Sequence, residues 1–177
     1  MTLELVEPTV DHESSYIGLV AEFEERREPL IPFPLKYPYE PFSELVQRLS
    51  AHSRGEDIPP GFVPHTTYWL VRDGTTVVAV SNLRHRLTDR LRRDGGHIGY
   101  GVRPTERGKG VGTEILRRTL DRARERGLDR VLLTCDKDNA PSARVIVKNG
   151  GVLAPEEYLP EQDDTVQRYW IELDTRG

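Results

Sequence analysis

The stretch VRPTERGKGVGTEIL, residues 102–116, joins the end of a predicted strand to the start of a predicted helix and contains three glycines, two arginines and a lysine. Glycine permits backbone angles that other residues resist, and it lets a ligand touch the main chain. The free amides of a helix's first turn and the helix dipole both attract anions. The stretch therefore predicts an anion site suited to phosphate or pyrophosphate.

Three kinds of phosphate site compete for this pattern. A P-loop needs a Lys-Ser/Thr pair after its last glycine, and no such pair is present. A dinucleotide-binding loop has the pattern G-x-G-x-x-G near the first strand; here the last glycine is missing and the loop follows the fourth predicted strand. The remaining interpretation is a coenzyme A pyrophosphate site, built on R-x-x-G-x-G at Arg107, Gly110 and Gly112.

The hydrophobic spacing predicts an α/β chain in which helices and strands are mixed. A hairpin is expected around the Asp73–Gly74 turn, and the apolar run RVLLTCD is typical of a buried strand. The short polar stretch TDRLRRDGG is expected to connect two strands through about one helical turn. We expect strands at 3–8, the two arms of 66–85, 97–102, 130–136, 152–158 and 166–173, and helices at 11–28, 42–55, 110–127 and 139–150.

Two segments together resemble the GNAT N-acetyltransferase superfamily: IGYGVRPTERGKGVGTEIL and the later VLLTCDKDNAPSARVIVKNGG. The stretch LRHRL…GGHIGYGVRP is also similar to a subgroup of predicted GNAT acetyltransferases. The resemblance implies a mostly antiparallel sheet of about seven strands, with helices on both faces. It also implies a central pair of parallel strands that splay apart, 97–103 and 130–136. One domain is expected over 1–177, with an acceptor-side wall at about 8–65 and an acetyl-CoA-binding core at about 95–151.

The same resemblance implies a set of acetyl-CoA contacts. Backbone groups of Tyr100 and Val102 would bind pantetheine, and an amide there would stabilise the oxyanion. Asn139 and Ser142 would contact the coenzyme A arm, although Asn139 is also a good helix N-cap. The pyrophosphate would lie against the loop residues Arg107, Gly108, Lys109, Gly110, Val111, Gly112 and Thr113. Arg103 would add positive charge.

The implied reaction is direct attack of a primary amine on the acetyl thioester in a ternary complex. Many family members protonate the thiolate with a tyrosine seven residues after the asparagine, and here that position is Ile146. Tyr100 and Tyr158 are the alternative phenols. Two rivals stay open: a non-catalytic acyl-CoA-binding sensor or scaffold, and a transferase for a longer acyl group.

The stretch after the hairpin supplies further candidates. His97 and His85 are candidate general bases, because histidine titrates near neutral pH. Arg86 is a candidate for binding a carboxylate on the acceptor, and Glu25 for binding a cationic amine. Cys135 is expected to be a small buried thiol.

Composition limits the partners. The net charge of −4 argues against a protein that coats nucleic acid, and a single cysteine excludes an intrachain disulfide. No signal peptide or membrane span is expected, so we expect a cytoplasmic protein. The expected partners are acetyl-CoA, with no metal, and a small-molecule or peptide amine. A homodimer is left open.

Overall fold

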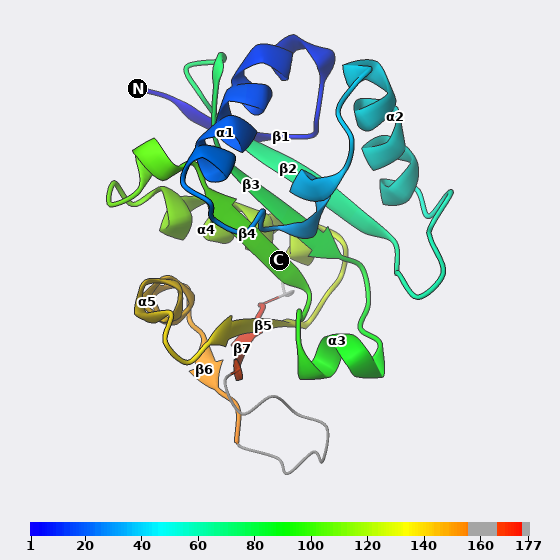
Figure 1. Ribbon diagram of the computed structural model, residues 1–177. Helices are drawn as coiled ribbons and strands as arrows, with labels where there is room; N and C mark the ends of the chain where they lie inside the picture. Colours follow the sequence, from blue (N-terminus) through cyan, green and yellow to red (C-terminus); the bar gives the residue numbers. More distant parts are fainter. Residues whose placement is uncertain (156–165, 175–177) are drawn as a thin grey trace.

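The computed structural model describes residues 1–155 and 166–174, and this part contains seven strands in two antiparallel sheets (Figure 1). The larger sheet has the order β1-β2-β3-β4 and the smaller sheet the order β5-β7-β6. The strands are β1 (Leu3–Val6), β2 (His65–Arg72), β3 (Thr76–Arg84), β4 (Ile98–Val102), β5 (Arg130–Asp136), β6 (Val152–Leu153) and β7 (Val166–Glu172).

The predicted order of helices and strands along the chain is confirmed. The α-helices are α1 (Glu13–Glu25), α2 (Phe42–Ser53), α3 (Asp89–Arg93), α4 (Val111–Glu125) and α5 (Ala140–Lys148). The short 3₁₀ helices are η1 (Val10–His12), η2 (Phe33–Lys36) and η3 (Pro104–Glu106). Strand β6 is shorter than predicted and ends at Leu153; part of the predicted strand, and Tyr158 with it, lies outside the described residues.

The expected single sheet with a central parallel pair needs correction, because β4 and β5 belong to different sheets. The two strands meet at one end. There the His97 amide donates to the Leu132 carbonyl at 2.7 Å, and the Leu132 amide donates to Nδ1 of the His97 ring at 2.9 Å. The imidazole thus accepts from an amide that would otherwise donate to a backbone carbonyl of a neighbouring strand. Beyond this point no backbone hydrogen bond joins β4 to β5 in the described ranges.

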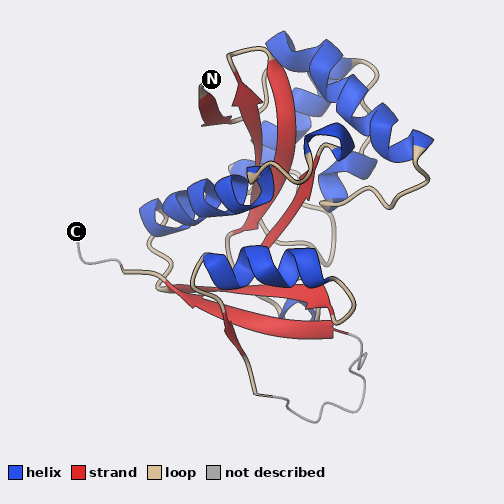
Figure 2. Ribbon diagram, turned by 90° about the vertical axis from the view of Figure 1, so that its left-hand side faces the viewer, coloured by secondary structure: helices blue, strands red, loops and turns tan. Residues whose placement is uncertain are grey.

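The larger sheet is covered on both faces (Figures 1 and 2). Helix α4 packs on one face, where its buried side chains join those of the smaller sheet and α5 in one core. Helices α1 and α2 pack on the other face, around Trp69, Tyr16 and Leu19. A β-bulge opposite Leu70 and Val71 helps to fill both cores, because Val77 and Val80 face α1 while Val78 faces α4.

The segment between α1 and α2 lies directly on β4. A Cβ on Gly101 would be 2.0 Å from the Ile31 carbonyl oxygen, and a Cβ on Gly99 would be 3.3 Å from Pro32. Only glycine at position 101 permits this approach. The segment between α1 and α2 is therefore packed tightly against β4, the strand that carries Tyr100 and Val102. In the described part of the chain, none of the helices combines the length and apolar character needed to cross a membrane.

Candidate active site

The glycine-rich loop leads from β4 through η3 into α4. Gly108 and Gly110 have φ of +75° and +79°, a left-handed conformation that favours glycine, and Gly110 is the N-cap of α4. Its carbonyl accepts from the Glu114 amide at 3.1 Å, which closes the first helical turn. Within the described part of the chain, the amides of residues 108–113 have no hydrogen-bond acceptor. Together they present open donors at the helix N-terminus, a surface suited to an anion.

The gap beside β4 adds a second set of open amides. The Arg103 amide donates to the Val78 carbonyl on β3 at 2.9 Å. Amides alternate in direction along a strand, so those of Tyr100 and Val102 turn away from β3 and toward β5. Because β4 and β5 share no ladder past His97, these amides line the space between the two sheets.

Arginine and lysine side chains of the loop are paired with carboxylates. Arg107 forms a bidentate pair with Glu28, with Nη2 to Oε2 at 2.6 Å and Nη1 to Oε1 at 3.0 Å. Its guanidinium also lies 5.4 Å from the centre of the Phe23 ring. Lys109 lies 3.4 Å from Glu106. The predicted excess of positive charge around the loop is therefore balanced in this state, and the backbone amides are its open groups.

Arg103 is held in the same way by Glu22 of α1. Its Nε donates to Glu22 Oε1 at 2.8 Å, and Glu22 also accepts from the amide and hydroxyl of Thr105. Burial alone would raise the pKa of Glu22, but these hydrogen bonds lower it below its usual value. Glu22 of α1 and Glu28 in the turn after it thus hold the glycine-rich loop against α1. The sequence pointed to the acidic run EFEERRE as a place for a cationic amine, but it did not predict that Glu22 and Glu28 pair with arginines of the loop.

Tyr100 connects β4 to α5. Its hydroxyl lies 2.9 Å from Oγ of Ser142, and burial raises the pKa of Tyr100 to about 12. The Ser142 amide in turn donates to Oδ1 of Asn139 at 3.2 Å, so Asn139 caps α5. A Cβ on Gly112 would lie 3.9 Å from the Tyr100 ring and 3.5 Å from Val102. The fold therefore brings together predicted cofactor residues from β4, α4 and α5.

Comparison with known proteins shows the family. The sequence profile described as "Acetyltransferase (GNAT) family" matches residues 25–150. The chain belongs to the GNAT acetyltransferase family. No curated protein matched the chain in the sequence comparison.

Solved GNAT structures share the fold of this acetyltransferase. One is RimL, a ribosomal L7/L12 alpha-N-protein acetyltransferase in complex with coenzyme A: TM-score 0.69, 21% identity, covering 99% of this chain and 96% of that one. Another is yncA, a putative acetyltransferase from Salmonella typhimurium with its cofactor acetyl-CoA: TM-score 0.63, 16% identity, coverage 98% and 95%. A third is the microcin C7 self-immunity acetyltransferase MccE with acetyl-CoA and AMP: TM-score 0.66, 14% identity, coverage 97% and 92%.

The candidate bases of this GNAT protein are engaged elsewhere. His97 Nδ1 accepts from the Leu132 amide, so the neutral ring carries its proton on Nε2. His85 contacts Thr66 Oγ1 at 2.8 Å and Arg126 at 3.5 Å. Arg126 is the C-cap of α4, so His85 lies at the opposite end of that helix from Gly110, about 22 Å along the axis. Burial lowers the pKa of both histidines to about 4.

The two predicted acceptor-binding residues, Arg86 and Glu25, are exposed. Neither makes a hydrogen bond or ion pair with the described residues, and the structure does not bring either into contact with Tyr100. Ile146 is fully buried in the core beside Gly151, so the usual tyrosine position holds an apolar packing residue. Cys135 is also buried, and burial raises the pKa of its thiol.

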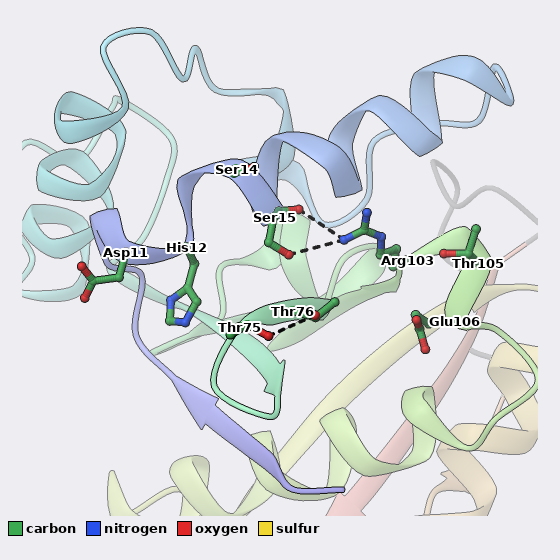
Figure 3. A pocket seen from close by; sticks show the side chains of 9 residues that line it. All are labelled: Asp11, His12, Ser14, Ser15, Thr75, Thr76, Arg103, Thr105 and Glu106. Atoms are coloured by element: carbon green, nitrogen blue, oxygen red, sulfur yellow. Dashed lines mark hydrogen bonds between the residues drawn. The ribbon is translucent and has the colours of Figure 1, made fainter.

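Two further features belong to the surroundings. A polar pocket of about 490 Å³ is lined in part by Arg103 and Ser15. Figure 3 shows Arg103 donating to Ser15 beside this pocket. The pocket does not include residues 108–113. Among the described residues, no group of three or more His, Cys, Asp or Glu side chains is placed to hold a metal ion.

Proposed function

We propose that this GNAT acetyltransferase transfers the acetyl group of acetyl-CoA to a primary amine, by direct attack in a ternary complex. The observation that carries the proposal is the run of unsatisfied amides at residues 108–113, next to a gap between β4 and β5 that is also lined by amides. The first set fits a pyrophosphate and the second fits an extended pantetheine arm. The titles of the solved relatives describe complexes with acetyl-CoA or coenzyme A.

The reaction needs an electrophilic carbonyl and a neutral amine. In our proposal the acetyl carbonyl oxygen accepts from an amide of β4 near Tyr100, which stabilises the oxyanion as the amine nitrogen attacks. The C–N bond forms, the tetrahedral intermediate collapses and the C–S bond breaks. Neither His97 nor His85 is assigned as base, because each ring nitrogen that accepts already has a protein donor. The proton of the attacking amine passes to water.

Tyr100 is our candidate for protonating the departing thiolate. A phenol whose pKa is about 12 is fully protonated at neutral pH and can donate. Ser142 is half-buried and lies within hydrogen-bond distance of the phenol, so it can return a proton from solvent. Tyr100 would thereby do the work that the family assigns to the position of Ile146.

The experiment is an assay of free coenzyme A thiol with acetyl-CoA and a panel of amines, amino acids and short peptides. Thiol release that requires an amine is the expected result, and mass spectrometry of the acetylated amine identifies the acceptor class. The rival is an acyl-CoA-binding module without catalysis, favoured by the apolar Ile146. Acetyl-CoA that raises the melting temperature without any amine-dependent release would support that rival.

A further inference from the structure

The Arg107–Glu28 ion pair links the loop expected to bind the cofactor to the layer expected to bind the acceptor. Glu28 follows α1, and its amide donates to the Phe23 carbonyl at 3.0 Å. The Phe23 ring in turn lies on β4, since its Cζ would be 3.5 Å from a Cβ on Gly101. Arg107 stacks over that ring and holds Glu28 with two hydrogen bonds. One contact chain therefore runs from β4 through Phe23 and Arg107 to the Glu28 carboxylate.

The Glu28 carboxylate binds Arg107 in the way that a bound phosphate would. A carboxylate in bidentate contact takes both donors of the guanidinium edge, as a phosphate does. Arg107 directly precedes the amides of residues 108–113, so we expect an anion bound on those amides to compete with Glu28 for the same guanidinium. The Arg107 and Glu28 side chains are 42% and 31% exposed, which allows the pair to separate without opening a core.

Release of Arg107 would leave Glu28 without its bidentate partner, and Arg26 would be the remaining cation that acts on its carboxylate. Glu22, the other acid that grips the loop, stays held by Arg103 and by Thr105. Glu28 lies three residues before Ile31, whose carbonyl touches β4 at Gly101. A freed carboxylate in this position attracts a positive charge on the acceptor side of the strand.

We propose that Glu28 recognises the acceptor and is unmasked when acetyl-CoA displaces it from Arg107. The inference rests on the proposed function and deepens it. The preferred acceptor is a primary amine that carries a second positive charge, such as a diamine or a peptide with a basic residue. The reacting amine is neutral, and the second cation pairs with Glu28. Acetyl-CoA and the cationic acceptor then bind with positive coupling, because the first ligand exposes the charge that the second needs.

The test compares Glu28→Gln with Glu24→Gln, which makes the same charge change at an exposed acid of α1 that has no ion pair in the described part of the chain. Acetyl-CoA affinity is measured by calorimetry at low salt. Glu28→Gln should bind acetyl-CoA about threefold to fivefold more tightly than Glu24→Gln, because the competing carboxylate is gone. It should also raise KM for 1,5-diaminopentane about twofold to fivefold, while KM for 1-aminopentane stays the same.

Two results would overturn the role of Glu28, and a third would overturn the proposed function itself. If the wild type binds acetyl-CoA and Glu28→Gln binds it no more tightly than Glu24→Gln, Glu28 does not compete for Arg107 and the inference is overturned. An equal change in KM for the two amines would also overturn it, since Glu28 would then recognise no second charge. If the wild type itself fails to bind acetyl-CoA, the proposed function fails first.

Discussion

At the scale of single residues, Tyr100 is our candidate proton donor in a chain whose usual tyrosine position holds Ile146. Tyr100→Phe keeps the ring and removes the hydroxyl that contacts Ser142. We expect kcat to fall roughly 10- to 100-fold, a modest effect for a general acid because a thiolate is already a tolerable leaving group. The KM for acetyl-CoA should stay close to the wild-type value. Steady-state kinetics measures both, with Tyr39→Phe as the matched loss of a phenol.

The pH profile gives a second readout of the same residue. A general acid works while protonated, and the pKa of Tyr100 is raised to about 12. Wild-type kcat should therefore show no loss between pH 8 and pH 10. If Tyr100→Phe stays within twofold of the wild type, or if kcat falls steeply between pH 8 and pH 10, Tyr100 is not the proton donor.

His97 was a candidate base in the sequence, and its geometry supports a structural role. His97→Phe removes the acceptor for the Leu132 amide and leaves that amide buried without a partner. We expect the free energy of unfolding to fall by about 1–3 kcal/mol, measured by urea denaturation. The folded variant should keep kcat within severalfold of the wild type. A variant of unchanged stability that has lost kcat a hundredfold would restore His97 as a catalytic residue.

At the scale of elements, the hydrophobic pattern predicts the order of helices and strands because each element has its own period. It does not predict that the strands divide between two sheets. That division depends on where β4 and β5 exchange hydrogen bonds, and a side chain, the His97 ring, takes one of the positions. A ring that replaces a backbone acceptor leaves no periodic signal in the sequence.

At the candidate site, too, the sequence predicts local features but not long-range contacts. The glycines and the helix start predict the open amides, because these are local properties of residues 102–116. The partners of Arg103 and Arg107 are Glu22 and Glu28, which lie 81 and 79 residues earlier in the chain. Such pairing depends on how α1 packs against the loop, and charge alone in the sequence does not specify it.

At the scale of the whole molecule, buried histidines make stability depend on pH. Burial lowers the pKa of His65 to about 3 and that of His97 to about 4, while unfolded histidine titrates near 6.5. Below about pH 6.5 the unfolded chain binds protons that the folded chain refuses. The stability is therefore complete at neutral pH and is lost progressively as the pH falls toward 4.

We expect His65, His97 and His85, whose pKa is also lowered to about 4, each to remove about 1–2 kcal/mol from the free energy of unfolding between pH 7 and pH 5. Urea denaturation at the two pH values measures the sum. His65→Phe should flatten the dependence if the variant folds. An unfolding free energy that is the same at pH 7 and pH 5 in the wild type would contradict the burial of neutral histidines.

The most direct test of the proposed cofactor site uses two glycines at the two ends of α4. Gly110 and Gly127 have φ of +79° and +83°, and a Cβ at either would meet nothing within 4 Å. Gly110→Ala and Gly127→Ala should therefore each cost about 1–2 kcal/mol of stability through the same backbone strain. They differ only in that Gly110 stands among the open amides.

The measurement is calorimetric titration of acetyl-CoA into the wild type and both variants, under conditions in which all three are folded. We expect the wild type and Gly127→Ala to bind acetyl-CoA with the same affinity, and Gly110→Ala to bind it at least about tenfold more weakly, because its amides are displaced or blocked. Equal binding by Gly110→Ala and Gly127→Ala, or no binding by the wild type, would contradict the assignment of this loop to the cofactor.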